Sequence, residues 1–334
     1  MRVAIIGAGL QARRRAPAIK KLGDELVVVC SAHEETARKF AEEMGCDYSA
    51  AWDKVITRED IDAVVVCTPP STHAPISIAA MNEGKHVLCE KPLAKDSEEA
   101  KRMLAAAKEN STALKCGFNH RYHPSLIGIK NLIKKGELGD VFYIRANYGI
   151  GARVGYEREW RVDSRFVSGG QLMEQGIHLV DLARWYLGEF FEVFAMTANF
   201  YLKTEPFEDN AFVSLRTFEG RIAFIHASLT TWKNTFRLEV FGSDGYAISS
   251  GLGGSYGTET LSYGRREPNR PFTEHVTEFR GEDPCWTEEW REFKNLTETP
   301  SDTSFALDGL KALQIIEKAY ESAKLAKIVT ISVQ

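Results

Sequence analysis

The chain has 334 residues, of which 44% are hydrophobic and 26% charged, and its formal charge is −4. These values are ordinary for a soluble globular protein, and the length suggests two domains of roughly 100–200 residues each. Basic and acidic residues are interspersed, so the sequence carries no electrostatic footprint of a protein that binds nucleic acid or an anionic membrane.

The six cysteines form no C-x-x-C pair, which favours reduced core residues. The chain opens directly on a strand pattern without a signal sequence, and no apolar run approaches the roughly 18 residues of a membrane helix. We therefore expect a cytoplasmic protein.

The first motif is a dinucleotide-binding fingerprint. An apolar run over 3–6 predicts a strand, and G-x-G-x-x-A follows it before a helical stretch. The first glycine permits the tight turn, the second lets the backbone approach a pyrophosphate, and the alanine lets the helix pack closely on the strand. The helix N-terminus then faces the phosphates of NAD or NADP. The predicted contacts in this turn are Gly7, Gly9, Leu10, Gln11 and Ala12.

Strands and helices then alternate as far as residue 116. Short Val-rich runs separated by helical stretches predict a doubly wound parallel sheet of the Rossmann type, covered on both faces. Ligands of such sheets bind beyond the carboxyl ends of the strands. The residues there that we expect at the cofactor are Thr68, Pro69, His73, Glu90 and Lys91.

The residues after the second strand affect the choice between NAD and NADP. An NAD site usually carries Asp or Glu there to bind the ribose 2′-hydroxyl, whereas this chain has Ser31 and then His33. Ser31 could donate to a 2′-phosphate, with positive charge from His33, Arg38 or the cluster Arg13–Arg15. The pattern favours NADP; the alternative is a dual-specificity site in which Ser31 only caps the next helix. Arg13–Arg15 could equally be the solvated face of a helix.

Lys91 ends an apolar strand and precedes Pro92. An ammonium at the floor of a cleft is desolvated, which lowers the pKa of the lysine and makes it a usable proton donor. Glu90 should point to the opposite side of the strand. Pro92 fixes the exit direction, and an X–Pro bond in such a corner can be cis. The alternative is a surface salt bridge at the strand end.

A helical segment over 168–188 carries the second cluster. The pair Gly169–Gly170 makes a flexible entry, and Glu174, His178 and Asp181 follow at spacings that place them on one helix face. Histidine titrates near neutrality and suits reversible proton exchange with an alcohol. The alternatives are a packing histidine or a metal site. Three ligands on one helix face are awkward and no second cluster accompanies them, so we predict no metal.

Beyond residue 120 the pattern changes to alternating apolar and polar runs. These predict a second, α+β domain with a large, mostly antiparallel open sheet. We expect domains over 1–120 and 121–334, with the helix 305–326 packing back on the first domain before a last strand over 328–333.

Three stretches in chain order carry a family resemblance: VAIIGAGLQA (3–12), HVLCEKPLA (86–94) and GGQLMEQGIHLVDLARW (169–185). Together they resemble the glucose-fructose oxidoreductase/inositol dehydrogenase/rhizopine catabolism family, usually shortened to Gfo/Idh/MocA. The resemblance extends to the segment 238–261, which is similar to the sheet of the family's second domain. It implies a homodimer or homotetramer formed through that sheet.

The resemblance also implies roles for the site residues. Lys91 becomes the catalytic-site lysine that contacts substrate and nicotinamide, with a peptide to proline that is often cis, and His178 becomes the general acid/base. Glu174 stands where many members have Asp, and Asp181 would bind substrate or brace the helix. The segment from Thr68 to His73 would line the nicotinamide ribose.

Two further segments, GFNHRYHPS (117–125) and RVGYEREWR (153–161), resemble a branch found among enzymes of sugar and nucleotide-sugar metabolism. Arginines suit phosphate or carboxylate, and a tryptophan suits a sugar face. The alternative for each residue is loop packing or surface charge. The substrate-side candidates are Asn119, Arg121, His123, Arg153, Tyr156, Trp160 and Arg161.

The sequence thus predicts an NAD(P)-dependent oxidoreductase. It would transfer a hydride between the nicotinamide and a secondary hydroxyl or ketone of a sugar, cyclitol or nucleotide-sugar. Two alternatives remain: a redox-neutral, NAD-dependent enzyme that cleaves a glycosidic bond, and a non-catalytic cofactor-binding sensor.

Overall fold

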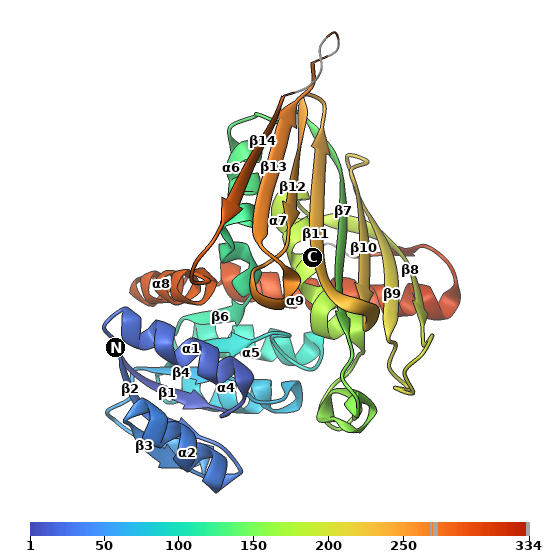
Figure 1. Cartoon of the computed structure of the whole chain (residues 1–334). Helices are drawn as coiled ribbons and strands as arrows, with labels where there is room; N and C mark the ends of the chain where they lie inside the picture. Colours follow the sequence, from blue (N-terminus) through green and yellow to red (C-terminus); the bar gives the residue numbers. More distant parts are fainter. Residues whose placement is uncertain (268, 270–272, 332–334) are drawn as a thin grey trace. The chain divides into compact units, whose positions relative to one another are not determined.

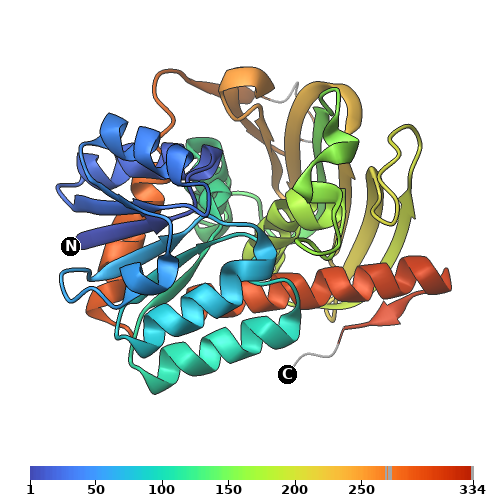
Figure 2. The ribbon, with the colours of Figure 1, turned by 90° about the horizontal axis from the view of Figure 1, so that it is seen from below.

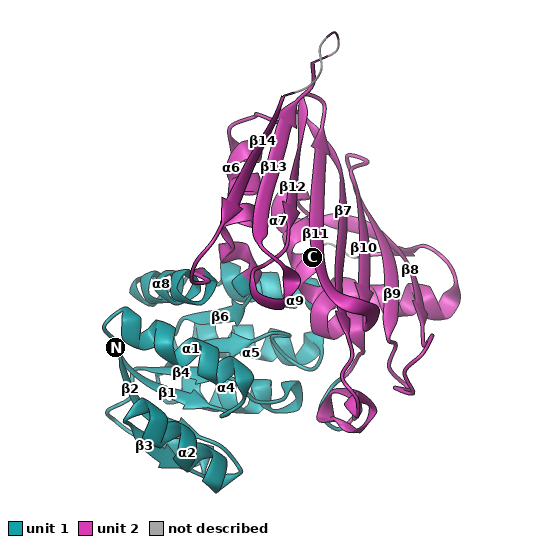
Figure 3. Ribbon diagram, viewed as in Figure 1, with its two compact units in different colours: residues 1–119, 165–167, 285–313 teal, residues 120–164, 168–284, 314–334 magenta. Residues whose placement is uncertain are grey.

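The computed structural model describes residues 1–267, 269 and 273–331 (Figure 1). The chain divides into two compact units (Figure 3). Unit 1 comprises Met1–Asn119, Arg165–Val167 and Cys285–Leu313, and unit 2 comprises His120–Ser164, Ser168–Pro284 and Gln314–Gln334. A single break at residue 120 therefore does not describe this division, because two later segments return to unit 1.

Unit 1 contains a six-stranded sheet in the order β3-β2-β1-β4-β5-β6, and every pair within it is parallel. This arrangement confirms the predicted Rossmann sheet. All residues of β4 and β6 are buried, as expected for strands covered on both faces. The strands are β1 (Arg2–Ile6), β2 (Glu25–Cys30), β3 (Asp47–Ser49), β4 (Ala63–Val66), β5 (His86–Glu90) and β6 (Leu114–Gly117).

Helices cover both faces of this sheet (Figure 2). Helix α1 packs against α8, which comes from a distant part of the sequence, and α4 packs against α5. The buried apolar cluster accordingly joins strand residues to Trp290, Phe293 and Leu296 of α8. The helices are α1 (Leu10–Lys21), α2 (Glu34–Met44), α3 (Trp52–Ile56), η1 (Pro70–Thr72), α4 (His73–Asn82), α5 (Ser97–Glu109), α8 (Cys285–Glu298) and the first part of α9 (Ser304–Leu325).

Unit 2 is built on a nine-stranded sheet in the order β14-β13-β12-β11-β7-β10-β9-β8-β15. Among the described strands, β7 and β10 form its one parallel pair, which confirms the predicted mostly antiparallel sheet. Its strands are β7 (Val141–Gly151), β8 (Phe190–Ala198), β9 (Asn210–Thr217), β10 (Ile222–Ser228), β11 (Thr230–Gly242), β12 (Gly245–Ser250), β13 (Glu259–Arg265), β14 (Glu274–Phe279) and β15 (Val329–Thr330). Residues 332 and 333 of the predicted last strand lie outside the described residues.

Helices pack on one face of this sheet. Helix α6 contacts β12 and β13, and α7 contacts β7 and β10. A π-helical turn, η5, leads directly into α7. The helical segments are η2 (Asn119–Tyr122), α6 (Pro124–Lys134), η3 (Tyr156–Arg158), η4 (Trp160–Val162), η5 (Leu172–Gly176), α7 (Ile177–Leu187) and η6 (Gly254–Tyr256). Within the described part of the chain, no helix is both long enough and apolar enough to cross a membrane.

Candidate active site

The turn between β1 and α1 fits a dinucleotide. Gly7 has φ +105°, and a Cβ on it would lie 2.4 Å from the carbonyl oxygen of Cys67, so this position requires glycine. Around Gly9, no heavy atom of the described residues lies within 4 Å of such a Cβ, so packing alone does not explain that glycine. A side chain there would instead fill the space over the first turn of α1, where a pyrophosphate binds in this fold.

Two buried polar atoms near this turn support the same conclusion. Within the described residues, neither Gln11 Oε1 nor Thr68 Oγ1 has a hydrogen-bond partner. Buried polar groups are normally hydrogen-bonded, so an unpartnered one at a predicted ligand site indicates a ligand that supplies the missing hydrogen-bond partner. Leu10 is 61% exposed on the same turn, whereas Ala12 is fully buried. Unit 1 therefore combines open space at the Gly9 backbone with two side-chain oxygens whose hydrogen-bonding capacity is available to a cofactor.

The residues predicted to bind the ribose 2′ position lie just after β2 and in α2. Ser31 Oγ accepts the backbone N–H of His33 at 3.3 Å, at the start of α2. Arg38 is exposed and donates to Glu35 and to Glu42, each at 2.8 Å. The positive charge of Arg38 is thus shared with two carboxylates. The preference for NADP stays a prediction.

Within the cluster Arg13–Arg15, the first two residues fit the solvated helix face and the third does not. Arg13 and Arg14 are exposed, but Arg15 is 3% exposed and donates to Glu90 at 2.6 Å and to Glu289 of α8 at 2.7 Å. Burial lowers the pKa of Arg15, but the two carboxylates outweigh it and raise the pKa above its ordinary value. Arg15 is therefore an interior cation that fixes the end of β5.

Lys91 follows Glu90 at the end of β5, and the Lys91–Pro92 peptide is cis, as the resemblance implies. The Glu90 carboxylate is buried against Arg15, whereas Lys91 is only partly buried. The two neighbours therefore differ in environment: Glu90 is buried in an ion pair, and Lys91 keeps part of its surface exposed.

His73 ties together two strand ends. Its ring is buried between the carbonyl oxygens of Thr68 and Pro92, which lie 2.7 Å from Nε2 and 2.8 Å from Nδ1. Both ring nitrogens thus face backbone carbonyls, and His73 holds the turns that carry Pro69 and Lys91. Its predicted contact with the cofactor remains a prediction, and the observed contacts support an indirect role.

In unit 2, Glu174 forms hydrogen bonds with two of the predicted substrate-side residues. It lies in the π-helical turn η5 and accepts from Tyr156 Oη at 2.6 Å and from Arg161 Nε at 2.7 Å. Burial and the neighbouring carboxylate raise the pKa of Tyr156 well above its ordinary range, so it remains a phenol donor. The structure therefore brings the segment that contains η3 and η4 into contact with Glu174.

Glu159, which the sequence analysis missed, extends this cluster. It accepts from Arg153 at 2.5 Å and from Arg161 at 3.1 Å. The guanidinium of Arg161 also lies 4.5 Å from the centre of the Trp160 ring. Trp160 is 37% exposed, so part of its ring remains accessible.

His178 is the second residue of α7, directly after η5, and is 3% exposed. Its ring stacks on the ring of His120, with centroids 3.7 Å apart. Sequence analysis missed His120, although it stands between two residues that were named, Asn119 and Arg121. A second histidine in NHRYH was the available signal.

The remaining candidates contact other buried side chains. Asp181 receives two hydrogen bonds from Arg121, at 2.8 and 2.5 Å, so this buried pair braces α7. His123 Nδ1 lies 3.0 Å from a carboxylate oxygen of Glu259 in β13. Asn119 donates to Cys285 Sγ at 3.3 Å. A direct substrate contact for these four candidates stays a prediction. Glu174 lies in the π-helical turn η5, whereas His178 and Asp181 lie in α7, and their joint action stays a prediction.

Comparison with known proteins places this chain in a family. Residues 1–118 match the group described as "Oxidoreductase family, NAD-binding Rossmann fold", and residues 127–248 match the "GFO/IDH/MocA C-terminal domain". The protein is therefore an oxidoreductase-family chain with an NAD-binding Rossmann fold. It belongs to the Gfo/Idh/MocA family, which confirms the resemblance.

Relatives of known activity act on sugars or cyclitols. The chain is 31% identical to inositol 2-dehydrogenase of Rhizobium meliloti, over 73% of this chain and 74% of that protein. It is 32% identical to levoglucosan dehydrogenase of Pseudarthrobacter phenanthrenivorans over 58% of this chain, but the match spans half of that relative's length. A solved levoglucosan dehydrogenase in complex with NADH and L-sorbose has the same fold, with a TM-score of 0.90, 22% identity, and 100% and 99% of the two chains covered.

Proposed function

We propose that this chain is an NAD(P)-dependent oxidoreductase acting on a secondary hydroxyl, or the corresponding ketone, of a sugar, cyclitol or nucleotide-linked sugar. The observation that carries the proposal is the joint placement of Glu174 and His178 at the junction of η5 and α7. The relatives named inositol 2-dehydrogenase and levoglucosan dehydrogenase support this substrate class.

Unit 1 supplies the cofactor-binding residues. The backbone at Gly9 would contact the pyrophosphate, while Gln11 Oε1 and Thr68 Oγ1 would gain the partners that they lack among the described residues. The nicotinamide, when bound, accepts or donates the hydride. Lys91, at the end of β5, would place its ammonium against the substrate oxygen that carries developing negative charge.

Unit 2 supplies the proton chemistry. In the oxidative direction His178 takes the hydroxyl proton while the carbon loses hydride, which leaves a ketone. In the reductive direction the same imidazolium returns the proton. Glu174 positions the substrate side of this helix, since its two carboxylate oxygens hold Tyr156 and Arg161.

The sequence favours NADP because no acid follows β2, and this finer choice is part of the proposal. Ser31, His33 and Arg38 would bind the 2′-phosphate. Titrating the chain with NADH and with NADPH, followed by nicotinamide fluorescence, tests the choice. In the NADP hypothesis, Arg38→Ala weakens NADPH binding and leaves NADH binding unchanged. Equal effects on both cofactors would contradict it.

A second copy of the chain would cover the open face of the unit 2 sheet. Phe212 of β9 lies opposite Met196 of β8 and His226 of β10, so their side chains share a face, and Phe224 follows on the same face. Met196, Phe212 and Phe224 are 57%, 37% and 48% exposed. A contiguous apolar face of this kind marks an interaction surface. Sedimentation of Phe224→Lys tests the proposal; an oligomer unchanged from wild type would contradict it.

The activity itself is tested by nicotinamide absorbance with NAD⁺ and NADP⁺ against free sugars, inositols, sugar phosphates and UDP-sugars. We expect net reduction with one substrate class. Release of a sugar from a glycoside without net reduction would instead support the redox-neutral alternative. Cofactor binding without turnover of any alcohol, ketone or glycoside would support the sensor.

A further inference from the structure

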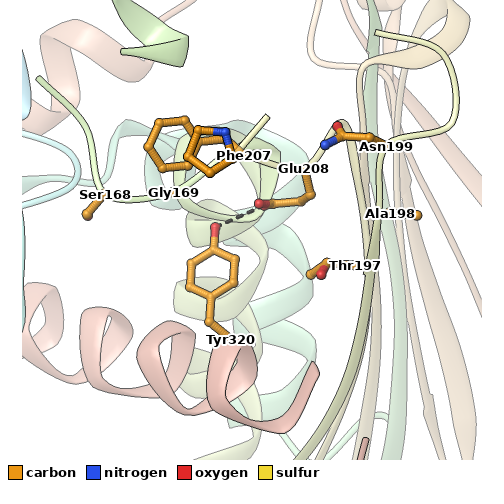
Figure 4. A pocket seen from close by; sticks show the side chains of 9 residues that line it. Ser168, Gly169, Thr197, Ala198, Asn199, Phe207, Glu208 and Tyr320 are labelled. Carbon is orange, nitrogen blue, oxygen red and sulfur yellow. Dashed lines mark hydrogen bonds between the residues drawn. The ribbon is translucent and has the colours of Figure 1, made fainter. Parts of the chain in front are cut away.

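Unit 2 contains a hollow of about 380 Å³ beside the entry to η5. Figure 4 shows Glu208 and Tyr320 in its lining, joined by a hydrogen bond. Glu208 lies in the loop before β9 and is 7% exposed, and Tyr320 belongs to α9. Neither residue was a candidate from the sequence, and neither belongs to the proton-transfer residues described above.

The Glu208 carboxylate holds the first residues of the helix that carries His178. One oxygen, Oε1, accepts the backbone N–H of Leu172 and the hydroxyl of Tyr320, both at 2.9 Å. The other oxygen, Oε2, accepts the N–H of Gly170 at 3.2 Å. The backbone carbonyl of Glu208 accepts the N–H of Gln171 at 3.1 Å. Three successive backbone N–H groups therefore donate hydrogen bonds to Glu208.

The tyrosine completes this arrangement from the other side. Its hydroxyl oxygen also accepts the N–H of Gly170, at 3.2 Å. Helix starts leave N–H groups without intrahelical partners, and a carboxylate there is favoured by the helix dipole. Burial raises the pKa of Glu208, although the N–H and hydroxyl donors partly offset that effect. Glu208 and Tyr320 therefore provide, in the protein interior, the hydrogen-bond acceptors that water or a capping side chain would provide at the surface.

The glycine pair before η5 is shaped to this contact. A Cβ on Gly170 would lie 2.3 Å from the carbonyl oxygen of Glu208, and one on Gly169 would lie 2.3 Å from Tyr320 Oη. Contacts this short do not occur, so side chains at 169 and 170 would push Glu208 and Tyr320 away. The pair Gly169–Gly170 thus serves close packing rather than the flexible entry expected from the sequence.

The held residues connect directly to the proton-transfer residues. The N–H of Glu174 donates to the carbonyl of Gly170 at 2.9 Å, and η5 runs without a break into α7 and His178. π-helical turns are rare and occur frequently at functional sites. A shift at 170–172 is therefore transmitted to Glu174 through this hydrogen bond.

We propose that Glu208, supported by Tyr320, is a positioning residue that sets the start of η5 and thereby the places of Glu174 and His178. This proposal rests on the proposed function for its catalytic consequence, but not for the positioning itself. Misplacement of a catalytic group by about 1 Å can cost roughly 100-fold in rate.

The test uses Glu208→Gln and Tyr320→Phe in the full chain. Hydrogen exchange followed by mass spectrometry should show faster exchange of the amides over 170–174 in both variants. Turnover per folded molecule should fall roughly 10- to 100-fold for Glu208→Gln and less for Tyr320→Phe. The NADH dissociation constant should stay at the wild-type value, because the cofactor residues belong to unit 1.

The matched control is Asp209→Asn. Asp209 is the next residue, fully buried, and its carboxylate accepts the N–H groups of Phe200, Tyr201 and Leu202 instead of helix residues. It should lose stability but keep the wild-type turnover per folded molecule. Wild-type exchange over 170–174 in Glu208→Gln would overturn the proposal, and if that variant does not fold, wild-type exchange in Tyr320→Phe would do so. Faster exchange with wild-type turnover, alongside an impaired His178→Ala, would also overturn it. An unimpaired His178→Ala would instead remove the proposed function, and exchange would still report the positioning.

Discussion

The imidazole of His120 stacks on that of His178, with ring centroids 3.7 Å apart and planes inclined by 26°. Both side chains are buried, and Tyr148 lies 5.3 Å from the first ring and 6.3 Å from the second. The χ2 torsion of a histidine side chain has a broad distribution of values. Packing against the flat ring of His120 restricts the His178 ring to one plane. His120 therefore fixes the direction in which the His178 nitrogens point.

Removal of this stack should impair proton transfer without impairing folding. We expect His120→Ala to lower kcat about tenfold, because the His178 ring gains rotational freedom. His120→Phe keeps a flat ring and should restore most of the rate. Steady-state kinetics of the two variants provide the check, and equal losses in Ala and Phe would show that the stack itself is not the cause.

Glu174→Gln should loosen the segment that contains η3 and η4. The substitution leaves Arg161 without the carboxylate that faces it at 2.7 Å and weakens the contact with Tyr156. We expect a higher KM for the sugar and faster proteolysis within 153–162. Glu157 lies in the same segment and forms an ion pair with exposed Arg158 at 3.6 Å, so Glu157→Gln provides the control variant. Identical proteolysis of the two variants would contradict this role.

Arg15→Met should destabilise unit 1 strongly. It leaves Glu90 and Glu289 buried without their shared cation, and breaking a buried ion pair in this way costs about 3–5 kcal/mol. Arg14 is the exposed neighbour, and Arg14→Met should change the unfolding free energy by about 0.5 kcal/mol or less. Urea unfolding of both variants gives the comparison. A change as small as that of Arg14→Met would contradict the role of Arg15 as the buried cation that pairs with both acids.

Asp209→Asn should show a pH-dependent loss of stability. Burial raises the pKa of Asp209, but hydrogen bonds from Asn210 and from three backbone N–H groups outweigh it and hold the pKa below its usual range. A depressed folded pKa contributes stability above the unfolded value of about 3.9, and that contribution disappears as pH falls through the folded pKa. Unfolding at neutral pH should therefore separate wild type from variant by about 1–3 kcal/mol. The two should converge under acid conditions, and a gap that is constant with pH would contradict the assignment.

The cofactor half of the fold follows from local sequence patterns. Short β-branched runs, glycines at strand ends and amphipathic helices each act over a few residues, and the first 118 residues contain them in order. Helix α8 illustrates what is missed. Its apolar residues Trp290, Phe293 and Leu296 have helical spacing, but nothing local indicates that they complete the core of unit 1.

The candidate site divides in the same way. Residue types identified Glu174, Tyr156 and Arg161, and the structure brings them into contact. Which charged residues form ion pairs could not be predicted in this way. Arg121 with Asp181 is an interaction across 60 residues that satisfies both charges, and neither spacing nor composition encodes it. Glu208 could not be identified from the sequence for a related reason. Its contacts are with backbone N–H groups at the start of a π-helical turn, and a sequence pattern does not indicate such contacts.

The most direct test of the central claim compares wild type with His178→Ala and Lys91→Ala, using the substrate class that the absorbance panel of sugars and inositols identifies, with both nicotinamide cofactors. We predict net cofactor reduction by wild type, a rate lower by roughly 10²–10⁴-fold in His178→Ala, a loss at least as large in Lys91→Ala, and unchanged NADH binding in the histidine variant. Near-wild-type turnover by His178→Ala, with the cofactor reduced as before, would contradict its assignment as the acid/base group.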